Sequence, residues 1–505
     1  MIAALEILIP ALYAIAIVVL TAYGGNLLWL ALFHATDEEL IDGPVPDPDA
    51  LPEPTSDWPT VTVQLPLYNE AEVAHRLIDA CVNLEYPRTK LEIQVLDDST
   101  DETTERVAER VEYWQDKGVD IVHVHRSDRT GYKAGALANG LRLAKGDYIA
   151  IFDADFVPTA DYLRRMIPHF FEDESLGMVQ ARWAHLNRDD SLLTQVQAFG
   201  LDAHFAMEQR VRQRADCFMN FNGTAGVWRR ACIEDAGGWE HDTLTEDLDL
   251  SYRAQLNDWR FKYVSAVEVP AELPPDMNAL RSQQFRWAKG GVETALKLAT
   301  RLWSSDQPLR VKLEGTFHLT AHCAFPFILI AALTHAPLLL MKGLGHGPGE
   351  LYFAIMGFGL FGFVGFFLAQ LFAQRALYPD WQHRLRLFPV FMAGTMGLSL
   401  SNTNAFWQAL RGTDMAFIRT PKYGQKEDDD DRWWRSRYAI AELPQVVWWE
   451  ALLAVYCTAG LGVVIALGEW AAVPFQALFA AGFILVTVSN LKQVFTVRQA
   501  VPAQT

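Results

Sequence analysis

The chain has 505 residues, half of them apolar, and a formal net charge of −18. On the usual size of about 100–200 residues per domain, this length predicts more than one structural unit. The acidic balance excludes a protein that binds the phosphates of nucleic acid, because such binding needs a basic surface. The five cysteines form no CxxC pair, so nothing in them requires an oxidising compartment.

Long apolar segments flank the charged middle of the chain. A helix needs about 20 apolar residues to cross a hydrocarbon core of roughly 30 Å. The first segment has no basic residues before it and is too long for a signal peptide, so we interpret residues 1–35 as a retained membrane anchor. The expected spans are Leu5–Phe33, Phe317–Met341, Leu351–Phe372, Val446–Leu467 and Val473–Leu491.

Residues 36–59 form a proline-rich linker, and an α/β domain is expected over 60–303. Short β-rich runs alternate there with longer amphipathic runs, which is typical of βαβ units with a mainly parallel sheet. In such sheets ligands bind beyond the carboxyl ends of the strands. The expected strands are Thr60–Leu65, Leu91–Asp97, Val119–Val124, Asp147–Asp153 and Gly177–Trp183, and the first helices are Glu70–Asn83 and Asp101–Gln115.

Residues 304–495 are expected to form interfacial helices and a C-terminal membrane bundle, followed by a tail at 496–505. Within residues 304–495, the apolar segment Leu387–Leu410 is rich in Gly, Ser and Asn, which are unfavourable in a helix that faces lipid. Arg375, Arg384 and Arg386 favour the cytoplasm on its N-terminal side, and if residues 412–437 are also cytoplasmic, the segment cannot be a simple single crossing. We therefore expect a kinked, re-entrant or interfacial helix there, in a multi-pass protein of the inner or plasma membrane with a cytoplasmic α/β domain.

Acidic residues follow two of the expected strands. Asp97 to Asp101 form a turn that can accept hydrogen bonds from a nucleoside, although the same turn can simply cap the next helix. Asp153 and Asp155 stand two positions apart after an apolar strand, and such a carboxylate pair can chelate Mg²⁺ or Mn²⁺. The metal would neutralise a diphosphate leaving group.

A third acidic motif is Thr245-Glu246-Asp247. The Asp247 carboxylate could take a proton from an attacking hydroxyl, which is general-base catalysis. The motif also resembles the start of a helix, with Thr245 as the cap. Both interpretations are compatible.

The fourth motif is QxxRW, which begins at Gln283. Arg286 supplies a planar cation for a diphosphate, and Trp287 offers a flat apolar surface on which a sugar can rest. The alternative is a basic amphipathic helix at a membrane interface, where Trp and Arg are common.

Together these motifs resemble those of the processive and lipid-directed members of glycosyltransferase family 2, which include cellulose synthase-like enzymes, hyaluronan synthases and ceramide glucosyltransferases. The resemblance covers roughly Pro59–Trp303 and includes LPLYNE from Leu65, RTGYKAG from Arg129 and FNGTAG from Phe221. It implies a GT-A fold, an α/β sheet with Rossmann-like strands, inserted between transmembrane helices. It also implies one direct displacement that gives a β-linked sugar.

The resemblance implies a role for each matching residue. Asp247 would be the catalytic base, and Asp153 with Asp155 would bind the divalent metal. The other expected donor-binding residues in the domain are Pro66, Tyr68, Glu70, Asp98, Lys133, Gln283, Arg286 and Trp287. The expected acceptor-binding residues are Trp239, Glu246 and Trp287.

A further segment, FIRTPK from Phe417, lies in the expected loop 412–437 and resembles the FxVTxK gating loop of cellulose synthases. Arg419 replaces the usual Val. Thr420 and Lys422 would bind the donor by closing over its diphosphate and expelling water. The alternative is a basic loop beside the membrane.

The expected reaction is transfer of glucose from UDP-glucose to a ceramide-type membrane lipid, because few of the spans carry polar groups that could line a sugar tunnel. The alternative is a processive β-glucan or β-mannan synthase that uses UDP-glucose or GDP-mannose. The residues that make up the motifs favour this alternative. Both are metal-dependent inverting hexosyltransferases. A third alternative, a transporter or receptor with a nucleotide-sensing domain, is disfavoured because it gives the acidic motifs no common function.

Overall fold

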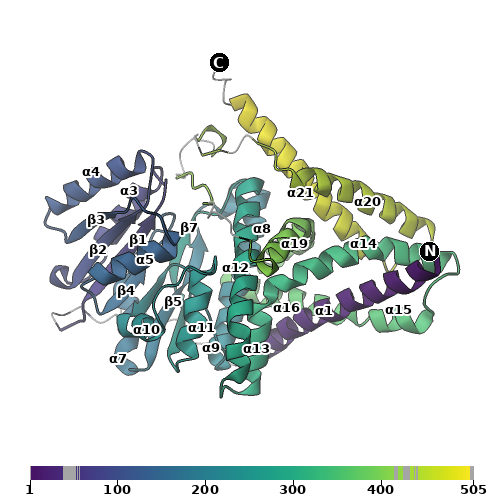
Figure 1. Cartoon of the computed structure of the whole chain (residues 1–505), viewed down its shortest axis with the longest axis horizontal. Coiled ribbons are helices and arrows are strands. Elements are labelled where there is room, and N and C mark those ends of the chain that lie inside the picture. The colour runs from purple at the N-terminus through teal and green to yellow at the C-terminus, as the bar shows by residue number, and fades with distance from the viewer. Residues whose placement is uncertain are drawn as a thin grey trace.

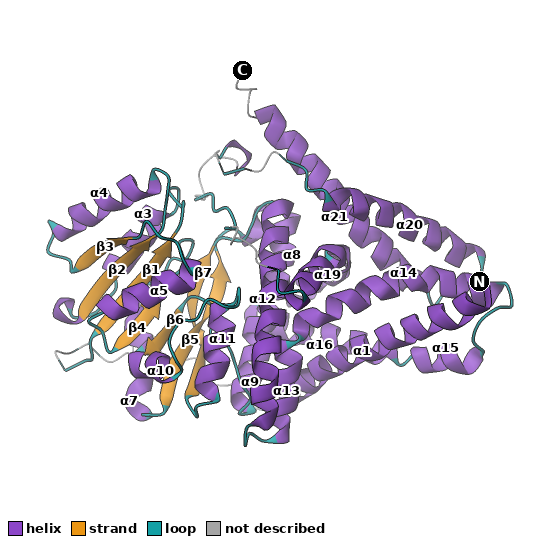
Figure 2. Ribbon diagram, in the orientation of Figure 1, coloured by secondary structure: helices purple, strands orange, loops and turns teal. Residues whose placement is uncertain are grey.

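The computed structural model describes residues 2–37, 53, 55, 57–413, 419–424, 433–436, 438–439 and 442–500. An α/β domain lies at one end of the molecule and a bundle of long helices at the other (Figures 1 and 2). The long helix α12 (Met277–Ser304) stands between them (Figure 1). The N-terminus lies at the end of the bundle that is farthest from the sheet.

The domain is built on one seven-stranded sheet in the order β3-β2-β1-β4-β6-β5-β7. Strand β6 is antiparallel to both of its neighbours, and the other pairings are parallel. The expected mainly parallel α/β fold is therefore confirmed. The strands are β1 (Val61–Leu67), β2 (Leu91–Asp97), β3 (Ile121–His125), β4 (Tyr148–Ile151), β5 (Leu176–His185), β6 (Gly226–Arg229) and β7 (Arg260–Ala271).

Two hydrophobic cores sandwich the sheet. On β4, Tyr148 and Ala150 belong to one core, and Ile149 and Ile151 belong to the other. This alternation follows from the two-residue period of a strand. The helices of the domain are α3 (Ala74–Val82), α4 (Thr103–Gln115), α5 (Tyr132–Leu143), α6 (Tyr162–Met166), α7 (His169–Glu172), α8 (Leu192–Ala203), α9 (Gln209–Arg214), α10 (Arg230–Asp235) and α11 (Glu246–Gln255).

Among the described residues, five helices are long and apolar enough to cross a membrane, and they coincide with the five expected spans. They suggest a multi-pass membrane protein. The helices of this part of the chain are α1 (Ile2–Thr36), α13 (Leu309–Leu319), α14 (Ala324–Gly343), α15 (Glu350–Met356), α16 (Gly359–Leu377), α17 (Trp381–Arg384), α18 (Phe388–Gly397), α19 (Ser399–Leu410), α20 (Val446–Ala466) and α21 (Val473–Ala500).

Short helical turns join several of these elements. One of them, His204–Glu208, is a π-helix between α8 and α9. The others are 3₁₀ turns at Arg88–Lys90, Arg188–Asp190, Ala321–Cys323, Leu385–Leu387 and Trp433–Arg435.

The ambiguous apolar segment Leu387–Leu410 forms two helices, α18 and α19, which meet at Leu398. Gly397 explains how α18 can approach α21 closely. A Cβ atom at Gly397 would lie 2.3 Å from the carbonyl oxygen of Gly482, so only glycine fits there. The segment is therefore broken, in keeping with the expected kink.

Helix α12 connects the domain to the bundle through a buried ion pair. Arg281 Nη2 lies 2.6 Å from Glu450 Oε2 on α20. Arg281 Nη1 also donates a 3.1 Å hydrogen bond to Asn490 Oδ1 on α21. Five positions after Arg281, the same helix carries Arg286 of the QxxRW motif.

Candidate active site

A cavity of about 200 Å³ lies beyond the carboxyl ends of β1, β2 and β4, and we call it the acidic pocket. These are the strand ends at which the sequence predicts ligand binding. The structure brings almost the whole predicted set of site residues together there. The pocket is lined by Pro66, Tyr68, Glu70, Asp98, Lys133, Asp153, Asp155, Glu246, Asp247, Gln283, Arg286, Trp287, Thr420 and Lys422.

Trp239 is the exception among the predicted residues. It is 7% exposed and packs against Trp228 and Phe221, with ring centroids 6.0 and 6.3 Å apart. The preceding Gly237 and Gly238 both have positive φ, and the tryptophan that follows this turn fills a hydrophobic core. The structure therefore contradicts the expected contact between Trp239 and an acceptor.

The two carboxylates of the DxD motif each hold a lysine ammonium group. Lys133 Nζ lies 2.5 Å from Asp153 Oδ1, and Lys422 forms an ion pair with Asp155. Burial alone would lower the pKa of Lys133, but the carboxylates of Asp153 and Glu246 outweigh it and raise that pKa above its ordinary value. The site therefore attracts positive charge strongly.

Asp247 lies in the first turn of α11, with Glu246 beside it. Burial, followed by the negative charge of Glu246, raises the pKa of Asp247 to about 7. Gly223, at φ 80°, lies across from the carboxylate, and a Cβ atom there would be 3.1 Å from Asp247 Oδ2. The backbone at Gly223 thus approaches the carboxylate more closely than a side chain would comfortably allow.

Thr245 does not cap α11 through its side chain, as the sequence suggested. Its Oγ1 instead lies 3.0 Å from Oγ1 of Thr294 on α12. The helix interface competes with the local cap for the same hydroxyl group. The contact fixes α11, and with it Asp247, against the helix that carries QxxRW.

At the end of β2, Asp98 of the acidic pocket is held by Arg126, a residue that the sequence did not single out. Arg126 Nε donates a 2.7 Å hydrogen bond to Asp98 Oδ1, and Nη2 donates to Oδ2. The Arg129 guanidinium lies 3.3 Å from the centroid of the Tyr68 ring. Arg126 directly follows β3. Its position at the carboxyl end of a strand was the feature of the sequence that could have identified it as a site residue.

Arg419, Thr420 and Lys422 line the acidic pocket, whereas Phe417 and Ile418 fall outside the described residues. Thr420 Oγ1 accepts a 2.8 Å hydrogen bond from Arg286 Nη2. Arg419 Nη1 lies 3.6 Å from Oε1 of Glu70, whose pKa burial raises to about 7. The segment therefore contacts both the QxxRW motif and the turn that follows β1.

A second cavity, of about 600 Å³, continues from the acidic pocket between the helices of the bundle, and we call it the bundle cavity. It is lined by residues of the π-helix and by aromatic residues of several spans, none of which the sequence predicted. The wall shared by the two cavities contains Trp183, Leu201, Asn222, Thr245, Asp247, Gln283 and Trp287. Asp247 therefore faces both cavities.

Comparison with known proteins points to one group. Residues 59–290 match the family model "Glycosyltransferase like family 2". Glucomannan 4-beta-mannosyltransferase 1 of Oryza sativa subsp. japonica is 46% identical over 260 residues, which is 50% of each chain. Glucomannan 4-beta-mannosyltransferase 2 of Arabidopsis thaliana is 44% identical over 252 residues, which is 49% of this chain and 47% of the relative.

The chain thus spans about half the length of the curated relatives it matches. Among solved structures, it is similar to the mannosyltransferase PcManGT from Pyrobaculum calidifontis, which was solved with GDP-Man and Mn²⁺. The TM-score is 0.53 at 21% identity, and the match covers 80% of this chain and 100% of the other. At this identity the likeness shows a shared fold.

Proposed function

From the premise that residues 59–290 form a glycosyltransferase family 2 domain, we propose that the chain is a membrane-bound inverting hexosyltransferase that extends a β-glycan, with GDP-mannose as the first candidate donor. The observation that carries the proposal is the position of Asp247 in the wall between the acidic pocket and the bundle cavity. A donor in the first cavity and an acceptor in the second would meet at this carboxylate.

The choice of mannose and of a glycan acceptor rests on the relatives over the same residues, which are named glucomannan 4-beta-mannosyltransferases. The UDP-glucose donor and ceramide-type acceptor that the sequence favoured receive no support from them, whereas the alternative of a processive β-glycan synthase does. Polar groups are scarce along the spans, but aromatic side chains can also line a sugar tunnel, because they stack on sugar rings. The bundle cavity has several, including Tyr23, Phe325, Phe366 and Phe391.

Asp153 and Asp155 fit a divalent metal. Both carboxylates face the acidic pocket and hold ammonium groups there, so they are already arranged to bind positive charge. A pair of carboxylates is an all-oxygen ligand set, which suits Mg²⁺ or Mn²⁺. When bound, such an ion would neutralise the diphosphate that leaves the donor.

The residues of the chain supply the remaining steps. Asp247 takes the proton of the acceptor hydroxyl, whose oxygen forms the new bond to the anomeric carbon while the bond to the diphosphate breaks on the opposite side. A pKa of about 7 suits a base that works near neutral pH. Arg286 stabilises the leaving diphosphate, since burial lowers the pKa of Arg286 only to about 10 and the side chain stays positively charged.

The segment 419–424 would act as a lid. A donor diphosphate in the acidic pocket can replace Asp155 as the partner of Lys422 and would lie close to Thr420 and Arg286. Closing of the lid over the donor would exclude the water that otherwise hydrolyses it. We place the domain on the cytoplasmic side, which the basic residues Arg384 and Arg386 favour.

The test is product analysis with the full chain in lipid nanodiscs. Purified protein with Mn²⁺ is incubated with one labelled donor, either GDP-mannose or UDP-glucose. Each donor is tested with a β-manno-oligosaccharide primer, with ceramide and without any added acceptor. The proposal expects a labelled polymer from GDP-mannose that a β-mannanase digests. A single-sugar glycolipid formed from ceramide, or no transfer from either donor, would overturn it.

A further inference from the structure

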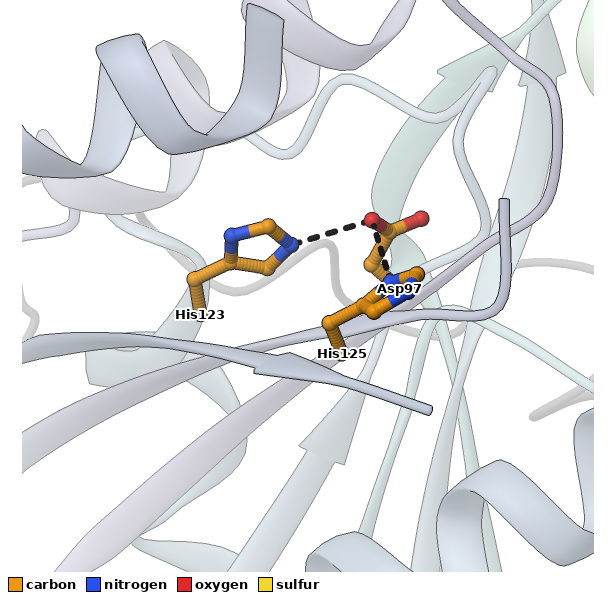
Figure 3. Close-up of side chains that lie close together, drawn as sticks. All are labelled: Asp97, His123 and His125. Atoms are coloured by element: carbon orange, nitrogen blue, oxygen red, sulfur yellow. Dashed lines mark hydrogen bonds and ion pairs between the residues drawn. The ribbon is translucent and has the colours of Figure 1, made fainter. Parts of the chain in front are cut away.

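Two histidines and a buried aspartate converge at the edge of the sheet, and none of them lines the acidic pocket (Figure 3). Asp97 ends β2, and its partner in the β2–β3 register is His125. His123 lies two positions earlier on β3 and therefore points to the same face. Strand β3 is the outermost strand of the sheet, so the two imidazoles can be reached from solvent.

The donor atoms are close enough to share one ion. His123 Nε2 lies 3.0 Å and His125 Nδ1 lies 3.2 Å from the same oxygen, Asp97 Oδ2. All three ligand atoms lie within 4.8 Å of one another. A tetrahedral Zn²⁺ ion, with bonds of about 2.0–2.1 Å, separates its ligand atoms by about 3.3 Å. Small side-chain rotations would therefore admit an ion between these atoms.

Asp97 is also held in place from its other side. The side chain is fully buried, and its Oδ1 accepts a 2.8 Å hydrogen bond from the backbone N–H of Ser99. In the part of the chain that the structure describes, the ion pairs of Asp97 are with the two imidazoles, because Arg126 pairs with Asp98 instead. Oriented carboxylates of this kind are typical of metal sites.

We propose that Asp97, His123 and His125 bind one late first-row divalent cation of the Zn²⁺ class, with water completing its coordination. Two imidazoles and one carboxylate suit Zn²⁺, Co²⁺ or Ni²⁺, whereas the all-oxygen pair of Asp153 and Asp155 suits Mg²⁺ or Mn²⁺. The two sites therefore differ in metal preference, and one can be filled without the other.

The ion would fix the turn that follows β2. Through its own hydroxyl, Ser99 accepts a 2.8 Å hydrogen bond from the backbone N–H of Asn69, which has a φ of 54°. Asp97 thus links the edge strand to the turns after β1 and β2. Because Asp98 lies next in the chain and lines the acidic pocket, the ion would restrain one wall of that pocket.

The test measures Zn²⁺ binding to the full chain in detergent. Metal-stripped protein is titrated with Zn²⁺ in excess Mg²⁺, which occupies the all-oxygen site, and the bound metal is counted. Co²⁺ serves as a second probe, because its visible bands report nitrogen ligation. We expect one Zn²⁺ per chain, also in Asp155→Asn. Absence of this equivalent from the unaltered chain overturns the proposal.

The decisive variant is His123→Gln/His125→Gln. Glutamine can still donate a hydrogen bond to Asp97 but is a poor ligand for Zn²⁺, so we expect at least about 100-fold weaker binding. His75→Gln, at an exposed histidine of α3, is the control and should keep the equivalent. Unchanged affinity in the double variant overturns the proposal. If the melting curve of the double variant shows that it does not fold, the single variant His125→Gln tests the proposal instead. The His125 side chain is 41% exposed, so its replacement should leave the fold intact.

Discussion

Lys422 forms an ion pair with Asp155, although 267 positions separate them in the chain. The ammonium group therefore neutralises a carboxylate that we assign to the metal. Because both groups are positively charged, Lys422 and a divalent ion compete for Asp155 until a diphosphate offers Lys422 another partner. The contact explains how one short segment can respond to both metal and donor.

Lys422→Gln should separate these two roles. Without donor, the variant should bind Mn²⁺ several-fold more tightly, because the competing charge is gone. Turnover should fall about 10- to 100-fold, which corresponds to the loss of one hydrogen bond to a charged group. Mn²⁺ titration and initial rates measure the two effects. Lys145→Gln, at a 63% exposed lysine, is the control and should change neither the Mn²⁺ affinity nor the turnover. If Lys422→Gln also left both quantities unchanged, the proposed lid would be refuted.

Asp247→Asn should abolish sugar transfer while donor binding persists. Loss of a general base reduces the rate by about 10²–10⁴-fold, and the amide cannot accept the proton. Single-turnover rates and titration with the nucleoside diphosphate separate chemistry from binding. The exposed Glu234→Gln in α10 is the matched control and should retain full activity. Transfer at the normal rate by Asp247→Asn would remove the assignment of the base.

The pH profile should follow the carboxylate of Asp247. The base works in its deprotonated form, so kcat/KM should fall on the acid side of about pH 7, approaching tenfold per pH unit, and level off above it. The charge of Glu246 contributes to the raised pKa. Glu246→Gln should therefore move the acid limb to lower pH. An acid limb that stays in place in this variant would show that another group controls the profile.

Arg126→Ala should destabilise the domain through Asp98. The Asp98 side chain is only 4% exposed, and removal of its partner leaves a buried carboxylate unpaired, at a cost of about 3 kcal/mol. Arg106→Ala removes an exposed ion pair with Glu102 and should cost at most about 0.5 kcal/mol. Denaturant unfolding of both variants gives the comparison. Equal stabilities would show that the Arg126 contact contributes little.

Hydrophobic patterning was enough to predict five of the seven strands, β1 to β5. The segment Leu91–Asp97 is a strand with the expected bounds, and its apolar residues Ile93, Val95 and Leu96 are all buried. Strands β6 and β7 were missed. The first is only four residues long and antiparallel, and the second is only partly buried, so neither gives the signal of a buried parallel strand.

The motifs predicted most of the acidic pocket, since the acidic ones lie at strand ends or in the first turn of a helix, while QxxRW lies within α12. Trp239 was misplaced because an aromatic residue beside an acidic loop looks the same in sequence whether it faces a sugar or a core. The bundle cavity could not be predicted, because its wall combines residues from distant parts of the chain, such as Tyr23 and Val486.

The ion pair between Arg281 and Glu450 has a practical consequence for any attempt to study the α/β domain by itself. A soluble fragment that ends after α12 would keep Arg281 but remove Glu450 and Asn490. In such a fragment Arg281 would have lost both partners, only five positions before Arg286, and the acidic pocket would lack Thr420 and Lys422. Excision would therefore take away part of the acidic pocket together with the bundle, so the proposed site depends on the C-terminal helices as fully as on the sheet.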